Sequence, residues 1–402
     1  FREDALMELS EKYRSVSPSS TLAIDSKYKE MKKSGLDVVG FGAGEPDFDT
    51  PRHIKDAAIK AINDGFTKYT PASGTLDLKK AICDKFKREN GLDYTVKNIV
   101  VSNGAKHALL NALGAIVNPG DEVLFSSPYW VSYKEMVKIS DGVPVIIDTR
   151  EEDNFKFTAE ELEAAITDKT KALILNTPSN PTGMVYSESE LAAIAEVVKK
   201  HDLFVISDEI YEHLIYDMER PRSIATIDGM KDRTIVVNGV SKTFAMTGWR
   251  IGYTAANEEI TSLMANVQSH YTSNPNSIAQ VAALAALTGP MDSVIEMKKA
   301  FNERRLYMVE RMNKIPGVSC IKPEGAFYVM MNISALKGKK IDGKTIETSD
   351  DFAGAFLEKE LVAVVPCSGF GNDNFVRWSY ATSMDNIKKG LDRLEKFIGE
   401  LE

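Results

Sequence analysis

Cysteine is scarce in this sequence of 402 residues, and so is any close spacing of metal ligands. The three cysteines, Cys83, Cys320 and Cys367, stand far apart, and the five histidines are scattered. Disulfide-built folds need a dense cysteine framework, and zinc sites need closely spaced ligands. Glu209 and His213, four positions apart, could face one metal ion, but no second histidine stands near them. We therefore expect no metal site, and a reducing compartment, by default the cytoplasm.

The sequence also lacks an excess of positive charge and a long apolar run. Its net charge is −9, which argues against a protein that grips nucleic-acid phosphates. The longest weakly polar stretch, residues 278–287, is too short to span a bilayer. The N-terminal segment is acidic and amphipathic, unlike a signal or transit peptide. We expect neither nucleic acid nor a membrane as a partner.

Three common catalytic motifs are absent as well. The glycine-rich "GFGAGEPD" has the wrong spacing for a dinucleotide-binding fingerprint, and the following "FDTP" blocks the helix that this fingerprint needs. "GVSKT" lacks the first glycine of a phosphate-binding Walker A loop, and there is no Gly-x-Ser-x-Gly nucleophile elbow. These absences disfavour a nucleotide-dependent dehydrogenase, an ATPase and a serine hydrolase of the usual kinds.

What the sequence does contain is an alternation of short apolar runs and longer helical patterns. Runs that are apolar on both faces and alternate with helices predict a largely parallel sheet covered on both sides, and ligands bind beyond the carboxyl ends of such strands. After about residue 290 a long charged helix is followed by further strands and helices, which predicts a smaller α/β domain. The predicted strands of the first part are 98–103, 121–127, 171–176, 203–209 and 234–239.

Several polar residues stand where the predicted strands end, and each has two interpretations. Gly104, Ala105 and Lys106 open a helix, where free N–H groups favour a phosphate, although an ordinary strand–helix turn has the same sequence. Asp208 could cap a helix, or its carboxylate could pair with a cationic ring beside the phenol of Tyr211.

Three more residues are equally open when taken alone. Asn180 lies in a proline-rich turn, where turn chemistry alone explains an asparagine. Trp130 could belong to the core or could stack on a flat ligand. Lys242, at the end of an apolar run, could be exposed, paired or a nucleophilic amine. Together these groups match what pyridoxal 5'-phosphate requires: an amine, a carboxylate for the ring nitrogen, donors, a stacking ring and a phosphate cradle.

The motifs carry a resemblance to a known family along essentially the whole chain. "AGEPDFDTP", "KYTPASG", "SPYWVSY", "NTPSNPTG", "SDEIYE", "SKTFAMTGWRIGY", "GAFYV" and "VRWSYATS" occur in this order. The chain thereby resembles the class I (fold-type I) pyridoxal-phosphate-dependent aminotransferases, in particular the bacterial aspartate aminotransferase branch. The resemblance implies a large cofactor-binding domain over 49–290 with a mostly parallel seven-stranded sheet between helices. It further implies a small α/β domain over 291–402, which the N-terminal segment 1–48 joins.

The resemblance also implies a role for each matching residue. Lys242 would bind the cofactor covalently and serve as general base, with Asp208 at the ring nitrogen, Tyr211 and Asn180 at its phenolate oxygen, and Trp130 stacked on the ring. The phosphate would lie against Gly104, Ala105, Lys106, Ser241 and Arg250, and Tyr69 would reach the phosphate of the neighbouring subunit, which implies a homodimer with shared active sites. The substrate would contact Arg377, Gly44, Trp130, Asn180, Lys106 and Thr21.

Three positions depart from the pattern of the family. Gly239 stands where many relatives have a serine that contacts the phosphate, and Ser241 would replace that contact in part. Trp378 takes the place of a leucine or isoleucine, and Cys367 that of a glycine. The change at Cys367 leaves the loop details near Arg377 open, but not the chemistry.

The implied reaction moves the amino group of L-aspartate to 2-oxoglutarate, giving oxaloacetate and L-glutamate. Lys106 would read the side-chain carboxylate of the substrate, or would only help to neutralise the phosphate; an aminotransferase for aromatic or neutral amino acids is the alternative. Relatives active on prephenate carry Lys or Arg just before the "PS" near the N-terminus, where this chain has Ser17. The same fold could also run an elimination or a decarboxylation. A regulator built on this fold would need a DNA-binding domain, for which the chain has no spare length.

Overall fold

The computed structural model describes residues 8–19 and 21–402 and contains one large central sheet. Its strand order is β2-β8-β7-β6-β5-β3-β4, and all neighbours are parallel except that β8 runs antiparallel to β2 and β7. The inner strands are buried on both faces, as the continuous apolar runs predict. The strands are β2 (Ile99–Ser102), β3 (Glu122–Ser127), β4 (Val143–Asp148), β5 (Thr170–Asn176), β6 (Phe204–Asp208), β7 (Thr234–Gly239) and β8 (Gly252–Ala255).

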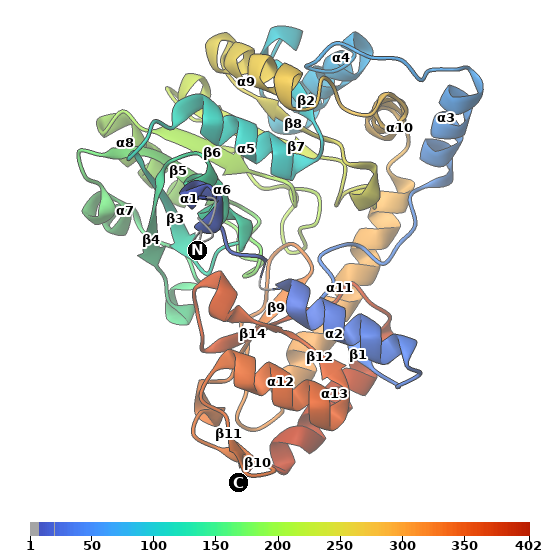
Figure 1. The fold of residues 1–402 in the computed structure, drawn as a ribbon, viewed down its shortest axis with the longest axis vertical. Helices are drawn as coiled ribbons and strands as arrows, with labels where there is room; N and C mark the ends of the chain where they lie inside the picture. The colour runs from blue at the N-terminus through green and yellow to red at the C-terminus, as the bar shows by residue number, and fades with distance from the viewer. Residues whose placement is uncertain (1–7, 20) are drawn as a thin grey trace, which may run out of the picture.

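Helices cover both faces of this sheet (Figure 1). One face packs against α5 (Ala105–Ile116), α6 (Ser132–Ile139) and α9 (Glu258–Tyr271). The other face packs against α7 (Ala159–Ala165), α8 (Glu188–Lys200), α4 (Leu76–Lys85) and α10 (Ser277–Thr288), and α3 (Arg52–Asn63) lies against α10. A π-helical turn, Phe86–Asn90, continues α4. The α/β architecture predicted from the sequence is confirmed.

A second, smaller sheet forms the lower part of the molecule in Figure 1. Its antiparallel strands β13 (Val365–Pro366), β14 (Phe375–Ser379) and β9 (Tyr328–Asn332) are covered by helices, and a short hairpin of β10 (Lys340–Ile341) and β11 (Lys344–Thr345) stands at its end. The helices are α11 (Asp292–Met312), α12 (Ser349–Glu360) and α13 (Met384–Gly399).

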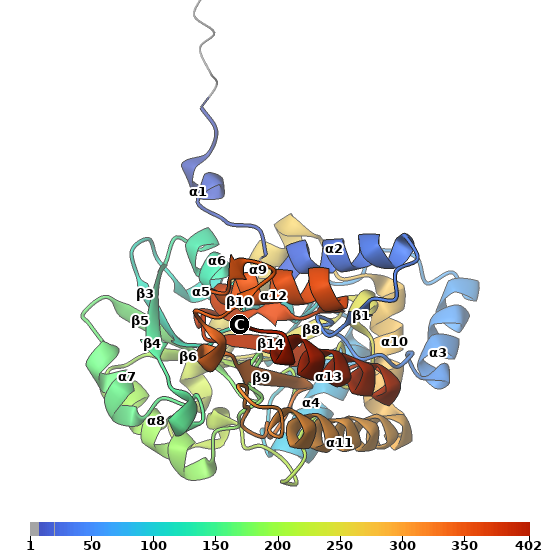
Figure 2. The same ribbon diagram turned by 90° about the horizontal axis from the view of Figure 1, so that it is seen from below.

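The N-terminal and C-terminal parts of the chain meet in this lower body. β1 (Val39–Gly40) pairs in parallel with β12 (Val362–Ala363), and α2 (Thr21–Lys33) lies beside them, as the blue and red ribbons show in Figures 1 and 2. Ahead of α2, the short helix α1 (Glu11–Arg14) contacts α6 of the large sheet. The helices α1 and α2 therefore lie against different bodies.

The structure differs from the predicted strands at two places. β4 was not predicted; its apolar run contains Pro144, which is typical of an edge strand, and most of its residues are half-buried or exposed. The single strand expected over "VAVVP" is divided at Val364, so that β12 pairs with β1 while β13 pairs with β14.

The apolar run at 278–287 lies in α10, half of whose side chains are buried among those of α3, α4 and the sheet. Among the described residues, no single helix is both long and apolar enough to cross a membrane; α10 and α11 meet both conditions only as a pair, and the two helices are bent by 80° relative to each other.

Candidate functional site

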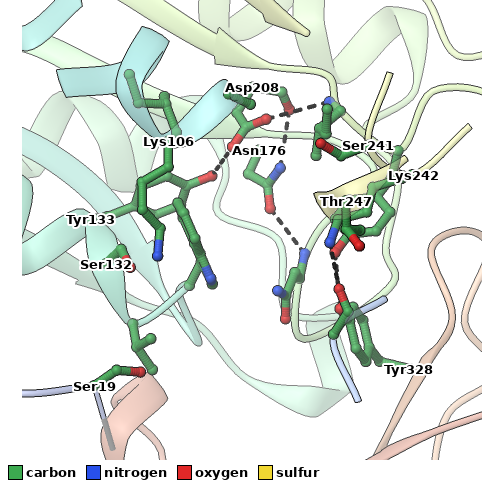
Figure 3. A pocket seen from close by; sticks show the side chains of 18 of the residues that line it. Ser19, Lys106, Ser132, Tyr133, Asn176, Asp208, Ser241, Lys242, Thr247 and Tyr328 are labelled. Carbon is green, nitrogen blue, oxygen red and sulfur yellow. Dashed lines mark hydrogen bonds between the residues drawn. The ribbon is translucent and has the colours of Figure 1, made fainter. Parts of the chain in front are cut away.

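A cavity of about 400 Å³ opens at the carboxyl ends of the large sheet, between the two bodies. Side chains from both bodies line it (Figure 3). Most residues that the sequence singled out lie in this one cavity: Gly44, Ala105, Lys106, Trp130, Asn180, Asp208, Tyr211, Ser241, Lys242, Arg250 and Arg377.

The amine of Lys242 lies in the cavity on the turn that follows β7. Its Nζ donates a hydrogen bond to the carbonyl of Gly44 and lies 5.8 Å from the ring centre of Tyr211. Burial lowers the pKa of this amine to about 8, and Arg377 and Arg250 act in the same direction, whereas Glu45 opposes them. A substantial fraction of Lys242 is therefore neutral near physiological pH, which makes it a competent base and nucleophile.

Asp208 is a buried carboxylate at the end of β6. Tyr133 donates its hydroxyl to Oδ2 at 2.6 Å, and the N–H of Ile210 donates to Oδ1 at 3.3 Å. Burial raises the pKa of Asp208 to about 6, although both hydrogen bonds and Lys242 lower it. No cation contacts this carboxylate within the described residues, so a positively charged ligand group would stabilise it.

An asparagine that the sequence had not singled out joins two strand ends beside Asp208. Asn176 donates its Nδ2 to the carbonyl of Asp208 at 3.0 Å and accepts the N–H of Asn180 at 2.9 Å. Tyr211 and Tyr328 share a hydrogen bond of 2.9 Å between their hydroxyls, and burial raises the pKa of Tyr211 well above its usual range. Tyr211 is thus a hydroxyl donor at neutral pH.

The start of α5 forms a corner suited to an anion. Gly104 precedes the helix with a φ of 86°, which favours glycine, and a Cβ there would lie 2.3 Å from Nη2 of Arg250. Gly104 therefore lies behind the Arg250 guanidinium, which faces the cavity together with Ala105, Lys106 and Ser241. Unpaired N–H groups of the first helical turn and this guanidinium would hold a phosphate.

Gly239 fits this corner sterically. A Cβ at Gly239 would lie 2.9 Å from the carbonyl oxygen of Ile251 and 3.0 Å from the Cα of Gly252. A serine at this position would therefore need a shift of the backbone at Ile251 and Gly252.

Arg377 reaches the cavity from β14. Its Nη1 donates to Oδ1 of Asn180 at 2.9 Å, its Nη2 donates to the carbonyl of Gly42 at 3.1 Å, and its guanidinium stacks 4.2 Å from the ring centre of Tyr328. Within the described residues its buried Nε has no hydrogen-bond partner and it forms no ion pair. Such a planar cation fits a carboxylate ligand.

Trp378 and Cys367, which depart from the family pattern near Arg377, belong to the lower core. The ring centre of Trp378 lies 4.6 Å from that of Phe41, and Cys367 is fully buried. Neither side chain lines the cavity.

Lys106 reaches the cavity from the first turn of α5, next to Trp130. Its Nζ lies 5.0 Å from the Trp130 ring centre. Burial and the charge of Arg250 lower the pKa of Lys106. Lys106 forms no ion pair with any described carboxylate, so its amine is available to an anionic ligand.

Two predicted residues lie elsewhere. Tyr69 is 88% exposed on the connection between α3 and α4 and does not line the cavity of its own chain. The side chain of Thr21 lies outside the described part of the structure. Roles for both therefore stay predictions.

Sequence reasoning missed Tyr133, Asn176 and Tyr328, which Figure 3 shows around the cavity. Each stands in a motif that was noted for another residue, namely "SPYWVSY", "NTPSNPTG" and "GAFYV". The sequence signal for these three residues was their position inside a family motif. Only the fold shows that their side chains contact Asp208, Asn180 and Tyr211.

Glu209 and His213, the two residues considered above as a pair of metal ligands, have different hydrogen-bond partners. Glu209 accepts hydrogen bonds from the hydroxyls of Ser207 and Ser223, at 2.9 and 2.8 Å. His213 instead bonds Glu89.

The cavity as a whole fits pyridoxal 5'-phosphate. It offers a buried amine, a buried carboxylate without a cation, hydroxyl and amide donors, an indole face and an anion corner. These are the groups that the ring nitrogen, aldehyde, phenolate oxygen and phosphate of this cofactor need.

Comparisons with known proteins agree with this chemistry. Residues 36–394 match the family model described as aminotransferase class I and II. The chain is 48% identical to the aspartate aminotransferase of Bacillus subtilis (strain 168), over 98% of this chain and 99% of that protein. It is 46% identical to the aspartate/prephenate aminotransferase of Nitrosomonas europaea, over 98% of this chain and 100% of that protein.

Solved structures agree in fold as well as in sequence. The aspartate aminotransferase from Rhizobium meliloti superposes with a TM-score of 0.95 at 45% identity, over 98% of this chain and 100% of that one. The aspartate aminotransferase from Thermus thermophilus with maleate gives a TM-score of 0.92 at 42% identity, over 97% and 100%.

The raised pKa of Asp208 predicts a cost to stability. Because the folded state binds this proton more tightly than the unfolded state, stability falls as pH rises from about 4 through about 6. Asp208→Asn removes the loss, so the cofactor-free variant should exceed the parent by roughly 3 kcal/mol above pH 6, at 1.36 kcal/mol per pKa unit. Urea unfolding across this pH range measures the difference.

The pH dependence is the decisive feature of this experiment. The advantage of Asp208→Asn should vanish below about pH 3, under the ordinary pKa of 3.8, where the parent carboxyl is protonated in both states. The exposed Asp168→Asn is the matched control and should show no such rise. An advantage that is the same at every pH would contradict the assignment of a buried charge at Asp208.

Proposed function

Because the chain belongs to the class I and II aminotransferase family, we propose that it transfers the amino group of L-aspartate to 2-oxoglutarate, giving oxaloacetate and L-glutamate. The family predicted from the motifs is confirmed by a match over most of the chain and by full-length relatives. The observation that carries the proposal is a buried amine of lowered pKa, Lys242, in one cavity with Asp208 and Arg377.

The cofactor of this reaction is pyridoxal 5'-phosphate, which supplies an electron sink for the carbanion that forms when the substrate loses its Cα proton. Asp208 would hold the proton of the ring nitrogen, while Tyr211 and Asn180 donate to the phenolate oxygen. Trp130 provides the flat face for stacking. The corner made by Gly104, Ala105, Lys106, Ser241 and Arg250 would hold the phosphate.

Lys242 would bind the cofactor through its amine and then, once released, act as general base. A pKa of about 8 leaves the amine able to accept a proton and to return it near neutral pH. The hydrogen bond to the Gly44 carbonyl keeps the amine directed into the cavity. Lys242 would therefore remove the proton from the substrate Cα and, in the reverse direction, return it there.

Arg377 would bind the α-carboxylate of the substrate, as its stacking on Tyr328 holds the guanidinium plane in one orientation. Gly44 and Trp130 border the same space. Lys106, which comes from the large sheet's helix α5 rather than from β14, would bind the side-chain carboxylate, and Thr21 would close over it. The Thermus thermophilus relative was solved with maleate, a four-carbon dicarboxylate of the size of aspartate.

The two bodies would act as domains that close on the substrate and exclude water, with a large domain over 49–290 and a small domain over 291–402 that the segment 1–48 joins. We also propose a homodimer, in which the exposed Tyr69 reaches the phosphate corner of the partner subunit. A hollow beside Arg250, lined by Asn103, Trp249 and Asn276, offers space for such a side chain.

The first prediction of this proposal concerns Lys242. The purified protein should be yellow, and borohydride reduction should fix the cofactor on Lys242, because its amine is the buried one that faces Asp208. Peptide mapping by mass spectrometry locates the label. A label on Lys106, or no label at all, would refute the assignment, and Lys106 supplies an internal comparison because both amines lie in the cavity.

A substitution of Lys106 distinguishes a dicarboxylic substrate from the alternative of an aromatic or neutral one. Lys106→Ala should lose roughly 2–5 kcal/mol of transition-state stabilisation for aspartate, as for a desolvated charge pair that loses one partner. Alanine or phenylalanine as donor should be much less affected, and kcat/KM for each donor with 2-oxoglutarate measures the difference.

The control is Lys134→Ala, which removes the same charge from α6 at a residue that does not line this cavity. An equal loss for all donors, or weaker cofactor binding alone, would assign Lys106 to the phosphate. The proposed function would then be an aminotransferase for aromatic or neutral amino acids.

Ser17 predicts poor activity with prephenate. Ser17 presents no positive charge, and its N–H donates to Glu135 at 3.0 Å, so a carboxylate already stands beside this position. Ser17→Lys should raise kcat/KM for prephenate and leave that for aspartate nearly unchanged; Ser17→Gln is the neutral control. Efficient turnover of prephenate by the parent protein would contradict the prediction.

A further inference from the structure

A cluster of buried charged residues lies beside the two loops that carry Asp208 and Lys242. Lys85, Glu89, Glu212 and His213 form this buried charge cluster, and their side chains are only 2, 11, 3 and 15% exposed. Lys85 ends α4, Glu89 belongs to the π-helical turn, and Glu212 and His213 directly follow Tyr211. None of the four lines the cavity.

The positive charge that balances the carboxylates of this cluster comes from a residue of the protein, Lys85. Glu89, Glu212 and His213 offer ligand atoms within 4.8 Å of one another, a spacing that a metal ion could use. The ammonium of Lys85, however, bonds Glu212 and lies 3.8 Å from Glu89. Asn90 and Asn238 each donate to Glu212 at 2.8 Å. Lys85 thus takes the place that a metal ion would need.

The hydrogen bonds of His213 have a defined direction. Although burial raises the pKa of Glu89, its hydrogen bond with His213 and the nearby positive charges lower it to about 2, so Glu89 is an ionised acceptor. The Nε2 of His213, 2.8 Å from Glu89, must therefore be the donor. In the neutral ring Nδ1 then accepts the hydroxyl of Thr243, 3.2 Å away.

This chain of hydrogen bonds ends at the residue after Lys242. Thr243 is buried and does not line the cavity, so it can act on the reaction only through the backbone that it shares with Lys242. The other end of this chain of hydrogen bonds is Glu89, in the π-helical turn that continues α4. The ion pair between Lys85 and Glu212 joins the end of α4 to the loop after Asp208. The cluster therefore connects both catalytic loops to one rigid helix.

We propose that Thr243 and His213 are positioning residues, which hold the turn of Lys242 so that its amine stays directed into the cavity when it is not bound. The inference rests on the proposed role of Lys242 as the reacting amine. A fixed position matters because a displacement of about 1 Å at a reacting group can cost about a hundredfold in rate.

The test compares Thr243→Val, which keeps the shape but removes the hydroxyl, with Thr243→Ser, which keeps the hydroxyl. Trace acetylation of the cofactor-free full chain at several pH values, followed by peptide mass spectrometry, gives the titration midpoint of Lys242. The parent midpoint should lie at about 8, and that of Thr243→Val should move toward the ordinary 10.5 by about one unit, since the amine leaves its buried place. Thr243→Ser should match the parent.

A second readout separates positioning from binding. In the cofactor-loaded enzyme, Thr243→Val should lower kcat with aspartate by about tenfold while KM changes by less than about twofold. The charged groups that face Lys242, namely Glu45, Asp208, Arg250 and Arg377, are unchanged in this variant, so a shifted midpoint reports movement of the amine.

Thr234→Val is the matched control, because Thr234 is equally buried at the opposite end of β7 and donates its hydroxyl to the carbonyl of Met230 at 2.7 Å. An unchanged midpoint and kcat in Thr243→Val, or equal shifts in Thr234→Val, would overturn the inference. Thr243→Ala carries the same expectation should the valine not fold. A parent Lys242 that titrates as an ordinary lysine would instead refute the proposed function.

Discussion

The site depends on one constraint, the presence of an amine and a carboxylate in the same buried cavity, where neither charge forms an ion pair with a described residue. Burial lowers the pKa of Lys242 and raises that of Asp208, so the pKa of each group lies closer to neutral pH, where the group can gain or lose a proton. Such groups destabilise a folded chain unless other interactions hold them in place. The surrounding structure supplies these interactions through Tyr133, Asn176 and the carbonyl of Gly44.

The large sheet supplies this arrangement because its parallel strands end at the same edge. Asp208 follows β6, Lys242 follows β7 and Asn180 follows β5, and these three strands are neighbours. The cavity needs the second body as well, since Arg377 comes from β14 and Gly44 from the segment after β1. Pairing of β1 with β12 brings the two ends of the chain together, so residues 333 positions apart, Gly44 and Arg377, face one ligand.

Charged side chains have different partners in the cavity and in the buried charge cluster beside it. In the cavity, positive groups such as Lys106 and Arg377 lack ion-pair partners among the described residues, as a site for anionic ligands requires. In the buried charge cluster, Lys85, Glu89, Glu212 and His213 satisfy one another, which stiffens the loops without offering a ligand site. Removing one member would leave an uncompensated buried charge, which costs far more than the pair contributes.

The sequence by itself determined the family and the α/β alternation. It also determined the residues with direct chemistry, since Lys242, Asp208 and Arg377 each stand in a short motif that is recognised from neighbouring positions alone. It also placed most strands of the large sheet, because their continuous apolar runs reflect burial on both faces. Only the tertiary structure decided the contacts that tune these groups: Tyr133 on Asp208, the split at Val364, and the chain from Glu89 through His213 to Thr243. These features join residues far apart in the sequence, 124 positions from Glu89 to His213 and 323 from Val39 to Val362, and depend on packing, which no local pattern encodes.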